Sequence, residues 1–365
     1  MFLCGLLALV GVLILGQFIG NSSLVAQSRS LHSGVTSRIK TAVYWTAPTI
    51  SLKHVPELAR HDMIIADLDN MFTSLASLRK LKELNPALKL LCYSNPMEVF
   101  ELSLPMKDRP LQSAWTREIK DRYPGWLLNT AGGKKAIFYE GMRMLNMTTT
   151  CPRLDGKIYV EWMADYLIGK VLSVKASPDS ALIWDGYFQD NSSPTISWIS
   201  PRDQFDADGD RRPDEDHVLD RNWSEGNRLF LSKIRQAMGR KFIMIGNKGV
   251  TDWSDLLDGR MFEWWPNDYL GDKKDGGWWQ SLVNSHQTGE YTILQVNEKD
   301  VELAVATALL SNRSPYISVG QNSLRYPEVL TTELGKGGEV LIRREFEGGY
   351  IEVNPAKRSA RIVKQ

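Results

Sequence analysis

Two acidic residues follow apolar runs that have the character of buried strands. Asp185 ends such a run in "IWDGYFQD", and Glu263 ends another in "GRMFEWWPND". Two carboxyl groups that face each other across a bond can hydrolyse it, because one protonates the leaving group while the other attacks the bond or activates water. Glycosidic bonds are cleaved in this way, and the aromatic residues beside both acids offer flat faces for sugar rings. We therefore predict Asp185 and Glu263 as a catalytic pair.

Several residues near these and other apparent strand ends are candidates for substrate contacts. The predicted substrate-binding residues are Trp45, Asp67, Asn95, Trp184, Tyr187, Asp190, Asn247, Trp264 and Trp265. A purely structural role is the alternative for each, since Asp and Asn often cap helices and turns, and tryptophan fills hydrophobic cores. The chain has twelve tryptophans in 365 residues, and we expect most of these rings in the core.

The elements that must position these residues alternate along the chain. Short apolar runs alternate with longer stretches of helical periodicity, which predicts repeated βα units and a parallel sheet. The predicted strands are Thr41–Trp45, Met63–Ala66, Lys89–Tyr93, Arg143–Met147, Ala181–Asp185, Lys241–Ile245, Arg260–Glu263 and Tyr291–Val296. The clearest predicted helices are Thr73–Leu84, Lys157–Val174, Gly226–Met238 and Val301–Leu310.

Eight strands predict an α/β fold of the (β/α)8 TIM barrel type. Reactive residues of such barrels lie at the carboxyl ends of the strands. Asp185 and Glu263 are 78 residues apart, which is enough for two βα units, so we expect them to meet across the barrel mouth.

The ends of the chain differ in character from the predicted barrel of residues 41–322. Residues 1–26 are mostly apolar and are predicted as a signal peptide or an N-terminal membrane anchor, followed by a linker at 27–40. Residues 323–365 alternate apolar and polar side chains around Gly and Asn-Pro turns, which predicts a small antiparallel β-hairpin extension. We expect the protein to be secreted or membrane-anchored and to face outside the cytoplasm.

An acidic loop lies in a predicted insertion at residues 191–225. The segment "DADGDRRPDED" places carboxylates at alternate positions around a glycine, a pattern suited to a hard cation such as Ca²⁺. The predicted ligands are Asp206, Asp208, Asp210, the Arg212 carbonyl, Asp214 and Asp216. It departs from an EF-hand, because His217 stands where a bidentate Glu belongs. A solvated acidic loop is the alternative to a structural Ca²⁺ site.

Composition argues against several other classes of function. The net charge is +1, with 44 basic and 43 acidic residues, so a nucleic-acid partner is not expected. His54, His61, His217 and His286 lack the spacing of a metal centre or a Ser-His triad, and no catalytic cofactor is expected. Cys92 and Cys151 form either one disulfide or, as we expect, two buried thiols. We also expect a monomer.

Three motifs in order resemble a known family. The runs "IWDGYFQD", "FIMIGNKG" and "GRMFEWWPND" resemble the endo-alpha-1,4-polygalactosaminidase-like glycoside hydrolases and the hypothetical glycosyl hydrolases related to them. The resemblance covers most of residues 41–320, and "RREFEGGYIEVNP" is similar to the hairpin extension of the hypothetical members. It implies that Asp185 is the nucleophile or stabilising acid, that Glu263 is the proton donor and that Asn247 lines the mouth. The insertion after Asp190 departs from the family pattern and leaves the sugar open.

Three functions compete on these grounds. The first is a glycoside hydrolase that cleaves an extracellular or cell-surface polysaccharide. The second is a catalytically inactive carbohydrate-binding protein on the same barrel, since a fold by itself does not determine chemistry. The third is a calcium-stabilised surface adhesion protein that uses its tryptophan-rich surface.

Overall fold

The computed structural model describes the chain in nine stretches. These are residues 39–101, 106–175, 181–199, 204–266, 289–310, 315–325, 342–346, 349–354 and 359–364. The chain divides into a large unit, residues 39–331, and a second unit formed by the two ends of the chain. Each unit is considered separately.

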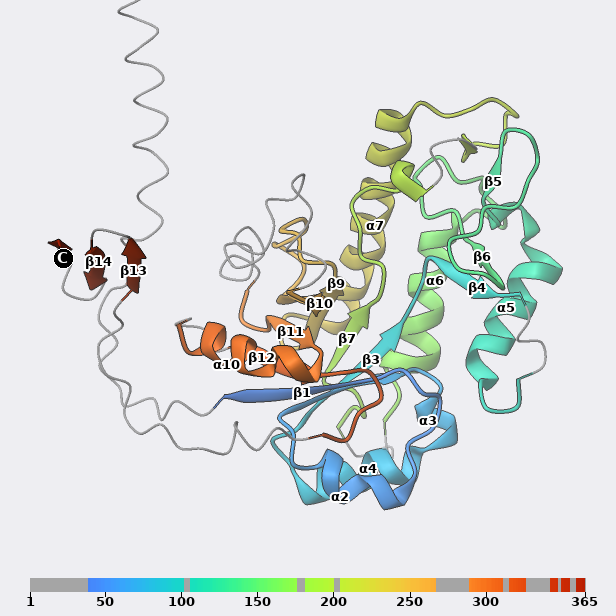
Figure 1. Ribbon diagram of the computed structural model, residues 1–365. Helices are drawn as coiled ribbons and strands as arrows, with labels where there is room; N and C mark the ends of the chain where they lie inside the picture. The colour runs from blue at the N-terminus through green and yellow to red at the C-terminus, as the bar shows by residue number, and fades with distance from the viewer. Residues whose placement is uncertain are drawn as a thin grey trace, which may run out of the picture. The chain divides into compact units, whose positions relative to one another are not determined.

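Eight parallel strands form a closed barrel in the large unit (Figure 1). They are β1 Lys40–Trp45, β2 Met63–Asp67, β3 Lys89–Ser94, β7 Gly186–Gln189, β9 Ile243–Asn247, β10 Gly259–Trp265, β11 Ile293–Val296 and β12 Tyr316–Val319. They are adjacent in this order, and β12 closes onto β1 through the pair Lys40 and Tyr316. The predicted (β/α)8 TIM barrel is therefore confirmed.

Successive side chains of each strand point alternately into the barrel and out toward the helices, so they form an inner core and an outer core. The inward residues are apolar over most of the barrel and form one buried cluster that includes Met63, Ile65, Leu91, Phe188, Ile245 and Met261. The intervening residues point outward and pack beneath the helices. At the carboxyl end of each strand the last inward residue is polar. These residues are Tyr44, Asp67, Tyr93, Asp190, Asn247, Glu263, Gln295 and Ser318, and we call them the polar rung.

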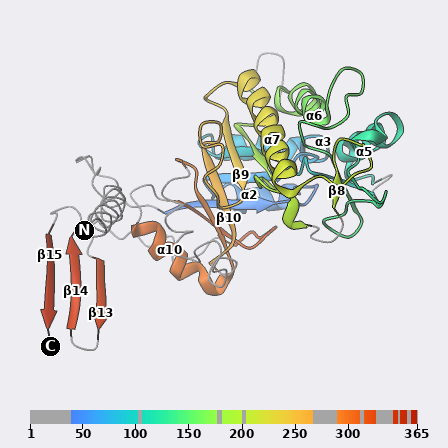
Figure 2. The same ribbon diagram turned by 90° about the horizontal axis from the view of Figure 1, so that it is seen from above.

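Helices cover the outside of the barrel (Figure 2). They are α2 Val55–Leu58, α3 Asn70–Thr73, α4 Leu75–Leu84, α6 Tyr159–Leu167 with a π-helical turn at Ile168–Leu172, α7 Asp216–Met238 and α10 Val301–Leu310. A further helix, α5 Pro110–Arg122, packs against the short strand Glu98–Phe100. The outer core contains large rings without solvent exposure, such as Trp126, Trp184 and Trp223. Helix α7 begins ten residues earlier than the predicted Gly226, so the tail of the predicted insertion is helical.

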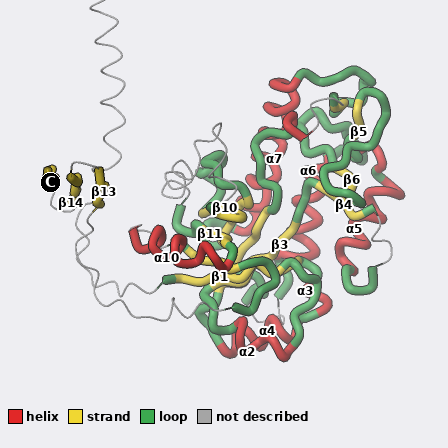
Figure 3. The backbone as a smooth tube through the Cα atoms, in the orientation of Figure 1, coloured by secondary structure: helices red, strands yellow, loops and turns green. Residues whose placement is uncertain are grey.

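A long excursion separates β3 from β7, and loops make up much of it (Figure 3). It holds the antiparallel pair β4 Glu98–Phe100 and β6 Met142–Met144. It also holds β5 Asn129–Thr130, which pairs antiparallel with β8 Phe205–Asp206 from the segment after β7. Short 3-10 turns occupy Leu52–His54, Pro124–Trp126, Ser197–Ile199 and Glu298–Asp300. The prediction of Arg143–Met147 as a barrel strand is wrong, because this segment pairs with β4 outside the barrel. The missing eighth strand is β12, "YISV".

The predicted strand Ala181–Asp185 is also displaced. The strand at this place is β7, which begins at Gly186 and runs through "GYFQ". Gly186 does not provide a turn: a Cβ there would lie 2.4 Å from the Ile243 carbonyl oxygen, so the residue allows the close approach of β9. The apolar run before it belongs to the outer core at the amino end of the barrel, where Trp184 is 1% exposed.

The C-terminal unit contains an antiparallel sheet with the order β13 Ile342–Phe346, β14 Gly349–Asn354 and β15 Ser359–Lys364. The predicted antiparallel extension is therefore confirmed, with three strands. Residues 1–26 and the predicted linker, except Ile39 and Lys40, lie outside the described residues. Among the residues described, no helix is long and apolar enough to cross a membrane. Cys92 and Cys151 are buried free thiols, as expected.

Candidate active site

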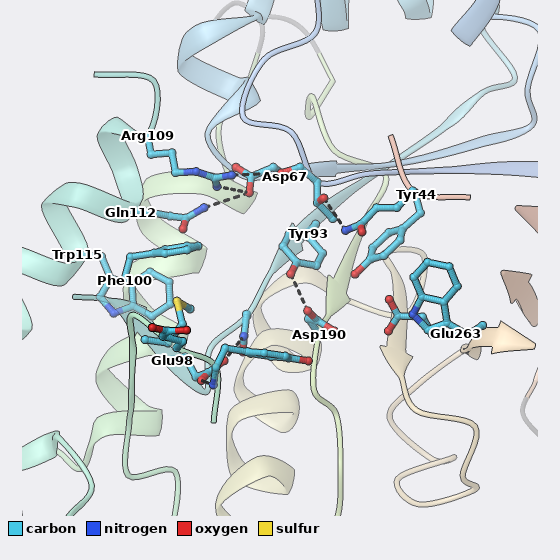
Figure 4. Close-up of a pocket in the computed structure, with 17 residues that line it drawn as sticks. Tyr44, Asp67, Tyr93, Glu98, Phe100, Arg109, Gln112, Trp115, Asp190 and Glu263 are labelled. Carbon is cyan, nitrogen blue, oxygen red and sulfur yellow. Dashed lines mark hydrogen bonds and ion pairs between the residues drawn. The ribbon is translucent and has the colours of Figure 1, made fainter. Parts of the chain in front are cut away.

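A cavity of about 410 Å³ opens at the carboxyl ends of the strands (Figure 4). Its lining residues are Tyr44, Thr46, Asp67, Tyr93, Asn95, Glu98, Phe100, Arg109, Gln112, Trp115, Tyr139, Glu140, Met142, Asp190, Glu263, Trp264 and Gln321. Five members of the polar rung form its floor, and the excursion between β3 and β7 supplies one wall. This is the face on which barrels carry reactive residues.

Two carboxylates of the polar rung are joined by one amide in this cavity. The Nδ2 atom of Asn247 donates to Asp190 Oδ1 at 2.7 Å and to Glu263 Oε2 at 2.8 Å. Asp190 also accepts from the Tyr93 hydroxyl at 2.6 Å and from the Asn191 backbone N–H at 2.8 Å. Three donors on its two oxygens suit the ionised form of Asp190. The Asn247 side chain therefore fixes two acids side by side.

Regular strand alternation directs Asp190 into the barrel, whereas a β-bulge directs Glu263 there. Asp190 follows β7 and continues the inward series of Gly186 and Phe188, so simple alternation points it into the barrel. At Glu263 the register between β10 and β11 shifts, which is a bulge at the rim of the barrel. Trp264 has a φ of 55°, and its backbone N–H donates to Gln295 Oε1 at 2.7 Å. This contact stabilises the left-handed conformation just after Glu263, and Trp264 stays partly exposed at the cavity wall.

Tyrosines surround the acids. Burial raises the pKa of Tyr44, and the charges of Asp190 and Glu263 raise it further. Burial and the neighbouring Asp190 likewise raise the pKa of Tyr93. Burial, followed by Asp190 and Glu263, raises the pKa of Tyr139 to about 12. All three phenols are therefore neutral donors at physiological pH.

A second group of acids occupies the opposite side of the cavity. Asp67 is 1% exposed and pairs with Arg109 Nη1 at 2.9 Å and with Gln112 Nε2 at 3.0 Å. Its pKa is nevertheless raised, because burial outweighs the Arg109 charge. Glu98 accepts from Asn95 Nδ2 at 3.0 Å, and burial raises the pKa of Glu98 to about 7. The cavity thus contains acids with different tendencies to hold a proton.

Asp185 lies at the other end of the barrel, so its predicted position beside Glu263 is wrong. It precedes β7, and its Oδ2 atom accepts from Lys82 Nζ at 2.5 Å and from the Leu90 backbone N–H at 2.8 Å. Its backbone bonds to Leu90 and Ile243 connect the amino ends of β3 and β9. The acid that the strand carries to the cavity is Asp190, five residues later.

The other predicted contacts divide between the cavity and the core. Asp67, Asn95, Asp190 and Trp264 line the cavity, and Asn247 lies directly beneath the acids. Trp45, Trp184, Tyr187 and Trp265 are buried and are not among the lining residues. Tyr187 points outward from β7, where its hydroxyl lies 2.8 Å from Ser94 Oγ. Trp45 and Tyr187 each follow or precede an inward-facing residue of their strand and therefore face outward, whereas Trp184 precedes β7 at the amino end of the barrel.

The acidic loop brings three of its predicted ligands together. One carboxylate oxygen from each of Asp206, Asp208 and Asp210 lies within 4.8 Å of the others. These side chains also accept backbone N–H groups of their own loop, as in the bond from Gly209 to Asp206 at 2.8 Å. Asp214 and Asp216 are outside this group, and Asp214 Oδ2 accepts from the Ala207 N–H at 2.6 Å.

Several cavity residues were missed from the sequence. Tyr44 and Tyr93 could have been found by continuing the inward alternation of their strands to the last residue. Glu98, Arg109 and Tyr139 carry no such signal, because they come from the excursion, whose path across the mouth is set by tertiary packing.

Comparison with known proteins places the chain in a family. The profile of hypothetical glycosyl hydrolase family 15 matches residues 82–323, which is more than half of the chain. A search of curated proteins gave no significant match. Among solved structures, a maltogenic alpha-amylase from Thermotoga neapolitana has 8% identity and a TM-score of 0.44, covering 88% of this chain and 87% of that one.

Two further solved structures are also similar. The isomalto-dextranase of Arthrobacter globiformis T6, complexed with panose, has 14% identity and a TM-score of 0.40, covering 78% of this chain and 53% of that one. The chitinase domain of a spore coat protein from Clostridium difficile has 13% identity and a TM-score of 0.29, covering 90% and 79%. The family profile spans the strands that carry Asp190, Asn247 and Glu263, and the chain belongs to hypothetical glycosyl hydrolase family 15.

Proposed function

We propose that the protein hydrolyses the glycosidic bonds of a polysaccharide or oligosaccharide with Asp190 and Glu263 as its catalytic acids. The observation that carries this proposal is the Asn247 amide, which holds both carboxylates at the floor of the cavity. Membership of a glycoside hydrolase family gives the class of reaction, and the cavity supplies the paired acids that this class requires.

The separation of the acids favours retention of the anomeric configuration. Both oxygens accept from the same nitrogen, so they lie no farther apart than the sum of the two hydrogen bonds, 5.5 Å. Retaining enzymes hold their carboxyl groups about 5–5.5 Å apart, whereas inverting enzymes need about 6.5–9.5 Å to admit a water molecule. The tight bridge leaves no such room between these two oxygens.

The hydrogen bonds also suggest which acid attacks. Asp190 accepts three hydrogen bonds, so it serves as the ionised nucleophile. Glu263 protonates the glycosidic oxygen as the bond to the anomeric carbon breaks and Asp190 forms an ester to that carbon. Glu263 then takes a proton from water, and the resulting hydroxide displaces Asp190 from the anomeric carbon. Both acids return to their starting protonation states.

Trapping of the intermediate tests the mechanism. The full chain is first screened for sugar release against soluble starch, dextran, xylan, galactan, chitosan and polygalacturonate, with Glu263→Gln as the inactive control. A 2-deoxy-2-fluoro glycoside of the cleaved sugar, bearing a good leaving group, should then label Asp190, as located by peptide mass spectrometry. A label elsewhere, or a product of inverted configuration by NMR, would contradict the proposal.

We also propose that this reaction takes place outside the cytoplasm. The support is the apolar stretch within residues 1–26. Fractionation of cells that express the tagged full chain tests it, since activity confined to the cytosol would exclude it.

A further inference from the structure

Three aromatic rings form a row that begins at the cavity, and the first and last of them are exposed. Tyr139, which lines the cavity, is 54% exposed, and Trp198 is 49% exposed. Phe138 lies between them: its ring centroid is 4.3 Å from that of Tyr139 and 5.5 Å from that of Trp198. We call these three residues the aromatic arm. Phe138 is partly buried and supports the two exposed rings, and exposed large rings beside a cavity commonly mark a binding surface.

The outer end of the arm is held rigidly. Asp220 on α7 accepts from the backbone N–H groups of Ile196 and Ser197 at 2.7 and 2.9 Å, and from the Ser197 hydroxyl at 2.7 Å. The Trp198 indole N–H donates to the Thr195 carbonyl at 3.0 Å. These bonds fix an exposed indole in one position without burying it, and such preorganisation lowers the cost of binding a ligand.

The arm is connected to the acids from two directions. On one side, the Tyr139 backbone N–H donates to Glu98 Oε1 at 3.3 Å, inside the cavity. On the other side, Lys248 places its Nζ 5.3 Å from the centre of the Trp198 ring and directly follows Asn247, which joins the acids. The residue after β9 and an acid of the excursion after β3 therefore contact opposite ends of the arm.

We propose that the aromatic arm binds further sugar units of the chain whose bond is cleaved in the cavity. This inference rests on the proposed function and adds that the substrate is an extended glycan. The occupant is a sugar chain because Tyr139 and Trp198 each offer an exposed flat apolar face with a polar group on the ring, the surface that a pyranose requires. The arm is continuous with the cavity, so one glycan occupies both.

Affinity electrophoresis tests the arm independently of hydrolysis. The full chain carrying Glu263→Gln is run in native gels containing soluble starch, dextran, xylan, galactan, chitosan or polygalacturonate. We expect retardation by at least one gel, loss of about tenfold or more in affinity with Trp198→Ala, which is about 1.4 kcal/mol, and substantial recovery with Trp198→Tyr. The matched control is Phe72→Ala, which removes a ring that is 58% exposed on α3 and does not line the cavity.

The outcomes separate the arm from the catalytic proposal. If retardation depends on Trp198 and the wild-type chain hydrolyses none of the glycans, the aromatic arm is supported as a binding surface and the proposed hydrolase activity is refuted. Retardation by no gel, or equal retardation of the Trp198→Ala and Phe72→Ala variants, would overturn the arm. Where the wild type hydrolyses the glycan, the ratio of kcat/KM for its hexasaccharide over its disaccharide should fall about tenfold with Trp198→Ala. An unchanged ratio would also overturn it.

Discussion

Replacing Asp185 and Asp190 separately by alanine distinguishes a structural acid at the amino end of β7 from the proposed catalytic acid at its carboxyl end. The Asp185 carboxylate is 29% exposed and accepts from Lys82 and Leu90 through one oxygen. A hydrogen bond to a charged group contributes about 1.5–3 kcal/mol, and partial exposure reduces the contribution of the Lys82 pair. We therefore expect Asp185→Ala to lower the free energy of unfolding by about 2–3 kcal/mol.

The magnitude can be followed as a melting temperature. At about 2–4 °C per kcal/mol for a domain of this kind, Asp185→Ala should melt roughly 5–10 °C lower, while kcat at 25 °C stays within about twofold of wild type. Asp190→Ala should lower kcat by about a thousandfold or more, the scale of a lost catalytic acid. Thermal melts by circular dichroism and turnover on the cleaved polysaccharide measure both. A folded Asp185→Ala variant without activity, or an Asp190→Ala variant with it, would refute the assignment.

Three further predictions concern protonation and calcium. The pKa of Glu98 is raised to about 7, so the protonated carboxyl stabilises the fold and this stabilisation is lost as pH rises from about 4.5 to 7. In denaturant titrations the free energy of unfolding of the wild type should fall by up to about 3 kcal/mol over this range, and Glu98→Gln should remove that fall. Burial lowers the pKa of His61 to about 4, so the pH dependence runs the other way: stability is lost as pH falls from about 6.5 to 4. The melting temperature of His61→Phe should therefore fall less than that of the wild type over this pH range. Millimolar Ca²⁺ at about a hundred times its Kd should stabilise the chain by about 2.7 kcal/mol, and Asp208→Asn should reduce this effect. If Ca²⁺ in place of chelator shifts the melting temperatures of the wild type and of Asp208→Asn equally, the acidic loop does not bind the ion.

The sequence was sufficient for the barrel because most of its strands are short apolar runs bounded by polar turns. The strand prediction failed at Arg143–Met147, because apolar and polar residues alternate in a small antiparallel pair just as they do in a barrel strand. The eighth strand, β12, is only four residues long and follows a helix of almost uniform hydrophobicity, so nothing in the local pattern distinguishes it.

Of the two acids proposed to be catalytic, the sequence identified Glu263 but selected Asp185 in place of Asp190. Glu263 was found because it ends an apolar run that is a strand, whereas Asp185 ends an apolar run that belongs to the outer core. Period-two alternation over "GYFQD" selects Asp190, but only once the start of β7 is known from the close packing of Gly186 against Ile243. The excursion that carries Glu98 and Tyr139 into the cavity depends on contacts between distant segments, which no local pattern records.

The polar rung has a consequence for how this scaffold can change over evolutionary time. The inward layers below it are apolar and hold the barrel closed, whereas the rung itself is occupied by acids, amides and phenols that favour reactivity over packing. Substitutions in the rung can alter the reaction while the lower layers keep the fold, and filling the rung with apolar residues should stabilise the barrel as it abolishes turnover. New specificities in this lineage are therefore expected to arise from one layer of eight positions and from the loops above it.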